Sequence, residues 1–155
     1  MALILIITRT GKEQRVAIDL EDALFHLDPE VNATFTGFPG VVMVNGKFDP
    51  IIAARVIKSF NIKDVLKIRP FLRTLSISEL DKVCKIIGDI VKREKTVGFR
   101  VYVRGAYLSK NTIKNLLFEC FKKTGVRISS SSSLFLVIDI VKDVIGFSLV
   151  DRKNA

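Results

Sequence analysis

Turn-forming residues divide the first 60 positions into short segments whose hydrophobic period alternates between strand and helix. Leu3 to Thr8 is rich in β-branched residues and predicts a strand almost at the N-terminus. Residues 12–27 carry apolar side chains at helical spacing, and Asp28-Pro29 ends that helix. The segments 32–38 and 41–44 are separated by a turn rich in glycine and proline, so they predict a β-hairpin.

A second helix is predicted to run from Pro50 to Phe60, because Asp49 suits the N-cap and proline suits the first helical position. The order is then β-α-β-β-α, which is a ferredoxin-like split motif that lacks its last strand. Residues 65–75 look extended, and they are the missing strand, the start of a second module, or both. We place the boundary after residue 64, giving an N-terminal domain of residues 1–64 and a second domain of residues 65–155.

The second domain also alternates between strand and helix patterns. Its strands are predicted at residues 97–104, 134–141 and 144–150. Ser78, with Asp81 at the capping-box spacing, predicts the start of one helix, and Ser109 predicts the start of another. The expected fold class is therefore α/β (α+β), with a ferredoxin-like module followed by a second α/β module.

Basic residues are concentrated in the second part of the chain. The protein has a net charge of +9. Residues 1–65 hold 7 basic and 8 acidic groups, whereas residues 66–155 hold 18 basic and 8 acidic groups. A basic module joined to a near-neutral one indicates a polyanionic partner, with nucleic acid ahead of an anionic membrane surface.

The search for catalytic and metal-binding motifs is negative. One histidine and two separated cysteines do not supply a usual zinc site, so we expect no metal and no cofactor. Cys84 and Cys120 each lie in an apolar helical pattern and are expected to be buried thiols rather than a disulfide. The apolar run from Ala2 to Ile7 is too short to span a membrane, so a cytoplasmic protein is expected.

The binding signal is strongest in the strand at residues 97–104. Alternation places Arg100, Tyr102 and Arg104 on one face, where arginine is suited to phosphate and tyrosine to base stacking. An ordinary polar outer face is the alternative interpretation. Lys110 and Lys114 share one face of the next helix near its N-terminus, where phosphate is also favoured.

Other basic residues allow two interpretations. Arg69 and Arg73 flank Pro70 and suit either a salt bridge at the seam between the modules or a phosphate contact. A second group lies at the end of a predicted helix or just after one, where cations complement the helix dipole: Lys92, Arg93, Lys95, Lys122 and Lys123. The five-serine run from Ser129 to Ser133 is expected to be a flexible loop.

Four stretches stand out by their order and spacing: Thr36 to Val42, Ile68 to Pro70, Phe99 to Gly105 and the closing strand pair around Gly146. In these stretches the chain resembles THUMP-domain proteins, specifically the small stand-alone type that assists tRNA cytidine acetylation. The resemblance covers nearly all 155 residues. The sequence departs from the family at Ser129 to Ser133, where relatives often have an Asn-Pro-like loop, and at Lys142 to Ile145 in the last turn.

The resemblance implies a ferredoxin-like domain followed by a THUMP domain that binds the acceptor end of tRNA. Catalysis would be left to a separate tRNA acetyltransferase or another modifying enzyme, so this chain is not expected to be an enzyme. The predicted RNA-binding residues are Arg69, Arg73, Arg100, Tyr102, Arg104, Lys110 and Lys114. Two alternatives stay open: an enzyme acting on a nucleotide or phosphorylated substrate, and a basic protein-interaction scaffold.

Overall fold

A computed structural model describes residues 1–106 and 108–155 of the chain. The chain divides into two compact units. Unit 1 comprises Met1–Phe71 with Asn154, and unit 2 comprises Leu72–Lys153 with Ala155. Among the described residues, no helix is both long enough and apolar enough to cross a membrane.

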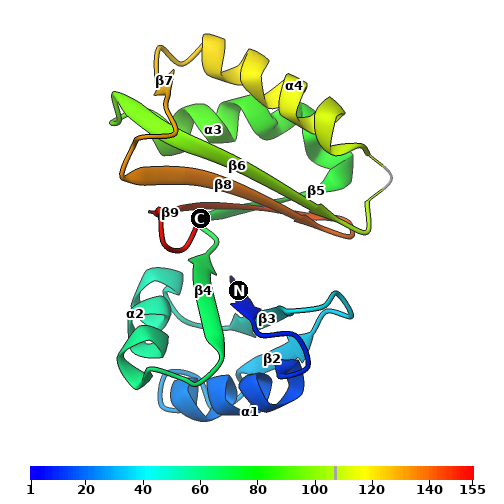
Figure 1. The fold of residues 1–155 in the computed structure, drawn as a ribbon, viewed down its shortest axis with the longest axis vertical. Helices are drawn as coiled ribbons and strands as arrows, with labels where there is room; N and C mark the ends of the chain where they lie inside the picture. Colours follow the sequence, from blue (N-terminus) through cyan, green and yellow to red (C-terminus); the bar gives the residue numbers. More distant parts are fainter. Residues whose placement is uncertain (107) are drawn as a thin grey trace. The chain divides into compact units, whose positions relative to one another are not determined.

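Unit 1 is an antiparallel sheet packed against two helices (Figure 1). Its elements are β1 (Ala2–Thr8), α1 (Glu13–Leu24), β2 (Asn32–Phe35), β3 (Val41–Gly46), α2 (Pro50–Phe60) and β4 (Val65–Pro70). The strand order is β2-β3-β1-β4, which is that of a complete ferredoxin-like motif. Its core joins the two helices to the sheet through fully buried residues such as Leu20, Ile6 and Ile57.

Residues 65–75 prove to be both of the alternatives that the sequence left open. Strand β4 pairs antiparallel with β1, so it is the fourth strand of unit 1, and residues 73–75 belong to β5, which pairs with β9 in unit 2. The Phe71 amide extends the pairing of β4 with β1 by donating to the Leu3 carbonyl oxygen, at 3.0 Å. The boundary between the units therefore follows Phe71 rather than residue 64, because sheet pairing holds residues 65–71 in the first unit.

Unit 2 is a mixed sheet with both of its α-helices on one face (Figure 1). Its elements are β5 (Arg73–Ser76), the 3₁₀ helix η1 (Ile77–Lys82), α3 (Val83–Val91), β6 (Thr96–Arg104), α4 (Lys110–Lys122), β7 (Arg127–Ile128), β8 (Leu134–Val141) and β9 (Val144–Asp151). The strand order is β5-β9-β8-β6-β7. Strand β8 is central and parallel to β6, and only its first residue escapes full burial, as its apolar sequence predicts.

Capping residues set the helix starts in both units. Asp49 caps α2 and Ser109 caps α4, as predicted. In contrast, the predicted cap at Ser78 is displaced: the capping box is formed by Ser76 and Glu79 at the start of η1. Ser76 and Glu79 have the same spacing as Ser78 and Asp81, so the motif alone did not determine at which serine the helix begins.

The two cysteines correct a prediction from sequence. Cys84 on α3 and Cys120 on α4 form a disulfide, with their Cα atoms 4.9 Å apart. The expectation of two separate thiols was wrong because it rested on sequence spacing and compartment alone. Packing of α3 beside α4 brings together two residues that are 36 positions apart.

Candidate nucleic-acid interface

Strand β6 presents two chemically different faces. Val97 and Val101 point to the face that α3 and α4 cover, and they belong to the main core of unit 2. Arg100, Tyr102 and Arg104 occupy the alternate positions and therefore point to the opposite face, where each is half-buried. The structure thus brings these three predicted residues to one face of the sheet.

One edge of β6 is open along most of its length. Strand β7 pairs only with Thr96 and Val97, while β8 pairs with residues 98–104 on the other side. Helix α4 starts beside this edge, and a small hollow of about 110 Å³ is lined by residues of both elements, including Tyr102, Lys110 and Lys114. The edge therefore brings lysines of the helix next to the tyrosine of the strand.

Two cations approach the ring of Tyr102. The Arg104 guanidinium carbon lies 5.3 Å from the ring centroid, and the Lys110 Nζ atom lies 6.0 Å from it. Both distances fall within the range of cation–π contacts. Lys110 is exposed and Lys114 is half-buried one helical turn away, so positive charge is placed beside an aromatic surface that suits a nucleobase.

A buried carboxylate fixes Arg104. Its Nη1 atom lies 3.2 Å from Asp139 Oδ1 on the neighbouring strand β8. Asp139 is the register partner of Tyr102, so the two residues are direct neighbours on adjacent strands. Sequence analysis missed Asp139, although the signal was present: it is the only charged residue in the apolar segment from Leu134 to Val141.

Arg100 is held by a different set of partners. Its guanidinium carbon lies 4.9 Å from the centroid of the Phe135 ring, and its Nη1 atom donates to the main-chain oxygen of Ala155, at 3.0 Å. The Phe135 ring lies across Gly98, its register partner on β6. A Cβ atom at Gly98 would come within 2.4 Å of that ring, so glycine is required there for this packing.

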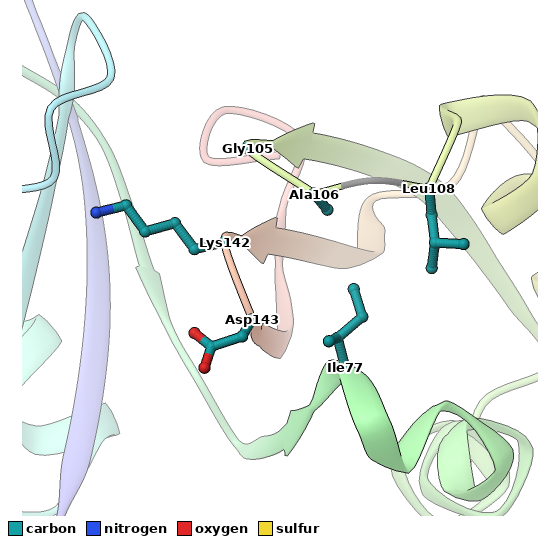
Figure 2. A pocket seen from close by; sticks show the side chains of 6 residues that line it. All are labelled: Ile77, Gly105, Ala106, Leu108, Lys142 and Asp143. Atoms are coloured by element: carbon teal, nitrogen blue, oxygen red, sulfur yellow. The ribbon is translucent and has the colours of Figure 1, made fainter.

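An apolar pocket of about 440 Å³ opens where β6 ends. Figure 2 shows Ile77, Ala106 and Leu108 directed into this space, while the side chains of Lys142 and Asp143 extend away from it. Lys142 adopts a left-handed conformation, with φ of 56°, in the β8–β9 turn, and its amide donates to the Arg104 carbonyl oxygen at 2.8 Å. The pocket therefore adjoins the backbone of the candidate interface.

Arg69 and Arg73 do not join this cluster. Arg69 belongs to unit 1, is 1% exposed, and donates from Nη1 to the main-chain oxygen of Asn154, at 3.1 Å. Its burial leaves almost no surface for a phosphate. Arg73 is exposed on β5, but it pairs with Phe147, whose side chain points to the helix-covered face, so it lies on the face opposite Tyr102.

No protein-family model matches the sequence, and no curated protein matches it. Solved structures do resemble it. TrmN from Thermus thermophilus superposes with a TM-score of 0.64 at 14% identity, and the match covers 96% of this chain and 45% of that one. PH1313 from Pyrococcus horikoshii Ot3 gives 0.63 at 14% identity, covering 97% of this chain and 55% of that one.

A third similar structure is a 4-thiouridine synthetase in complex with RNA and bound ATP, with a TM-score of 0.54 at 10% identity. The match covers 97% of this chain and 42% of that one. This chain therefore spans about half the length of the solved structures that it matches. The likeness shows the fold: a two-unit α/β protein with a THUMP-like arrangement, which confirms the predicted fold class.

Proposed function

We propose that this chain binds tRNA through unit 2 and presents the acceptor end to a separate modifying enzyme, with cytidine acetylation as the reaction served. The observation that carries this proposal is the convergence of Arg104 and Lys110 on the Tyr102 ring at the open edge of β6. Cations beside an aromatic ring form the combination that binds an unpaired nucleotide through its phosphate and its base.

Two further observations support an RNA ligand. Unit 2 holds 16 basic and 8 acidic residues, so its net charge of +8 accounts for most of the +9 of the chain. The apolar pocket beside Gly105 is of the size that accepts small ligands and would suit an unstacked base. One structure of similar fold was solved with RNA bound.

In this proposal the chain contributes binding and position, and the partner enzyme contributes the chemistry. Lys110 and Lys114 neutralise phosphates near the N-terminus of α4, where main-chain amides also favour anions. Tyr102 stacks against a base, and Arg104, held by Asp139, keeps its guanidinium beside the ring. Unit 1 sets the distance to the modified nucleotide or docks the enzyme.

The test measures the affinity of the full chain for a tRNA transcript and for the same transcript without its single-stranded 3′ end. The proposal expects weaker binding to the shortened transcript, and about 10-fold weaker binding of the intact one by a Lys110→Gln/Lys114→Gln variant. The matched control is Lys12→Gln/Lys58→Gln, which removes two exposed lysines of unit 1. Equal affinity for both transcripts would contradict recognition of the acceptor end. Acetylation by the purified chain alone would contradict the assignment of catalysis to a partner.

A further inference from the structure

A second group of basic residues lies at the other end of unit 2. The turn after α3, the C-terminus of α4, strand β7 and the residue after β9 meet there (Figure 1). We name this group the distal basic surface: Lys92, Arg93, Lys95, Lys122, Lys123, Arg127 and Arg152, all of them exposed. The acidic residues at the same end are Asp89, Glu94, Glu119 and Asp151, so cations predominate.

Backbone pairing holds these segments together. The Arg127 amide donates to the Lys95 carbonyl oxygen at 3.0 Å, and Arg127 pairs in register with Thr96 at the start of β6. Arg127 therefore lies next to Lys95 although the two are 32 positions apart in the sequence. Lys122 pairs with Glu119 at 2.8 Å, yet its side chain stays 72% exposed.

The five-serine segment, which the sequence predicts to be a loop, is a loop that hydrogen bonds join to this surface. The Ser129 amide donates to the Val97 carbonyl oxygen at 2.9 Å. Arg152 donates from Nη2 to the main-chain oxygens of Ser130 and Ser132, at 3.1 and 2.9 Å. Ser130 and Ser131 stay exposed, so hydroxyl groups are presented among the cations.

Complementing the helix dipole explains only part of the group. Lys122 lies in the last turn of α4, and Lys123 and Lys92 are the C-cap residues of α4 and α3, where a cation is favourable. Lys95, Arg127 and Arg152 instead lie in a loop, in a strand and after a strand, where the helix dipoles give no reason for a basic residue. Lysine, arginine and serine side chains together are the usual donors to nucleic-acid phosphates.

The predicted interface also holds fewer available cations than its sequence suggested. Arg69 belongs to unit 1 and is buried, and Arg73 lies on the face of the unit 2 sheet opposite Tyr102. Arg104 is shared with Asp139, and Arg100 donates to Ala155. Lys110 and Lys114 alone would neutralise few phosphates, so tight tRNA binding requires charge from another part of unit 2.

We propose that the distal basic surface is a second RNA-binding site, which holds the sugar-phosphate backbone of the tRNA whose acceptor end lies at the Tyr102 site. This inference rests on the proposed function. The distal basic surface adjoins Thr96 at the start of β6, and Tyr102 lies six residues further along the strand, so the two sites are about 20 Å apart. The RNA therefore runs along unit 2, and neither site reads its sequence.

The experiment measures the dissociation constant of a tRNA transcript as a function of salt for the full chain and for a Lys95→Gln/Lys123→Gln/Arg127→Gln variant. Loss of three phosphate contacts makes the slope of log K against log salt shallower by about 2 to 3 and weakens binding about 10- to 100-fold. A Lys95→Arg/Lys123→Arg/Arg127→Lys variant keeps the charges and should keep the wild-type slope. The single variant Arg127→Gln should make the slope of log K against log salt shallower by about 0.7 to 0.9.

The outcomes separate the two proposals. An unchanged slope in the distal triple variant, together with weakened binding by Lys110→Gln/Lys114→Gln, overturns the second site and leaves the proposed function standing. A lower melting temperature with unchanged affinity also overturns it, because that result assigns the residues to helix stability. A wild-type chain with no affinity for tRNA defeats the proposed function and the second site with it.

Discussion

The guanidinium of Arg104 and the carboxylate of Asp139 form an ion pair, 3.2 Å from Nη1 to Oδ1, that joins β6 to β8. The Asp139 side chain is fully buried, whereas that of Arg104 is 20% exposed. Arg104 therefore faces the candidate interface while it compensates a charge inside the unit. A residue placed in this way serves both the fold and the proposed binding of RNA.

Replacement of Arg104 by glutamine is expected to destabilise unit 2. The change removes a cation that pairs with a buried carboxylate, and breaking a buried pair costs about 3 kcal/mol of the free energy of unfolding. An Arg104→Gln/Asp139→Asn variant removes both charges and is expected to lose less than Arg104→Gln alone. Urea denaturation of the single and double variants, analysed as a double-mutant cycle, measures the coupling.

The Arg104→Gln/Asp139→Asn variant is also expected to bind tRNA more weakly than the wild type. It keeps neutral hydrogen-bonding side chains at both positions but has no guanidinium beside Tyr102. If the two single substitutions are strictly additive in unfolding free energy, the ion pair does not stabilise the fold and this interpretation of Asp139 fails.

Local signals in the sequence predicted much of the fold. The caps at Asp49 and Ser109 and the alternation in β6 depend on neighbouring residues, so they can be found without knowledge of the tertiary structure. The two-residue strand β7 has no such pattern and exists only because it pairs with Thr96 and Val97. Residues 65–71 likewise join unit 1 through pairing with β1, which periodicity does not reveal.

The candidate site was predicted less completely, since its composition depends on contacts between segments distant in sequence. Alternation correctly placed Arg100, Tyr102 and Arg104 on one face, but it gave no sign that Asp139 lies beside them. The position of Arg69 beside Pro70 allowed either a seam salt bridge or a phosphate contact, whereas the structure buries Arg69 and bonds it to the main-chain oxygen of Asn154. Whether the predicted residues bind RNA stays a prediction.

The disulfide between Cys84 and Cys120 is expected to make a large contribution to the stability of unit 2. It closes a loop with a sequence separation of 36 residues, for which the chain-entropy model gives about 4 kcal/mol. Reduction with a phosphine should therefore lower the urea midpoint of the wild type. The control is a Cys84→Ala/Cys120→Ala variant, whose midpoint should be low already and insensitive to the reductant. An equal response of both proteins would show that the reductant acts elsewhere.

Glycine at position 98 is expected to be required for the packing of Phe135. A methyl group there would meet the buried ring at 2.4 Å, so Gly98→Ala should lower the free energy of unfolding by about 1–3 kcal/mol. A Gly98→Ala/Phe135→Leu variant should lose less than the sum of its two single variants, since a smaller side chain relieves the clash. Gly88→Ala is the matched control, because nothing lies within 4 Å of a Cβ atom at that position in α3. A Gly98→Ala protein as stable as the wild type would contradict the packing.

Asp28 is expected to make the stability of unit 1 depend on pH in the acid range. Its carboxylate accepts hydrogen bonds from the amides of Lys47 and Glu30, at 2.8 and 2.9 Å, and these bonds lower the pKa of Asp28 below its ordinary value of 3.8. A lowered pKa means that the stabilisation is present above pH 3.8 and is lost as the pH falls through the folded value. Asp28→Asn should therefore be less stable than the wild type at pH 7, and the difference should narrow in acid. Urea midpoints of the wild type and of Asp28→Asn, measured at pH 7 and at a pH below the folded pKa of Asp28, test this. A difference between the two midpoints that stays constant or widens in acid would contradict it.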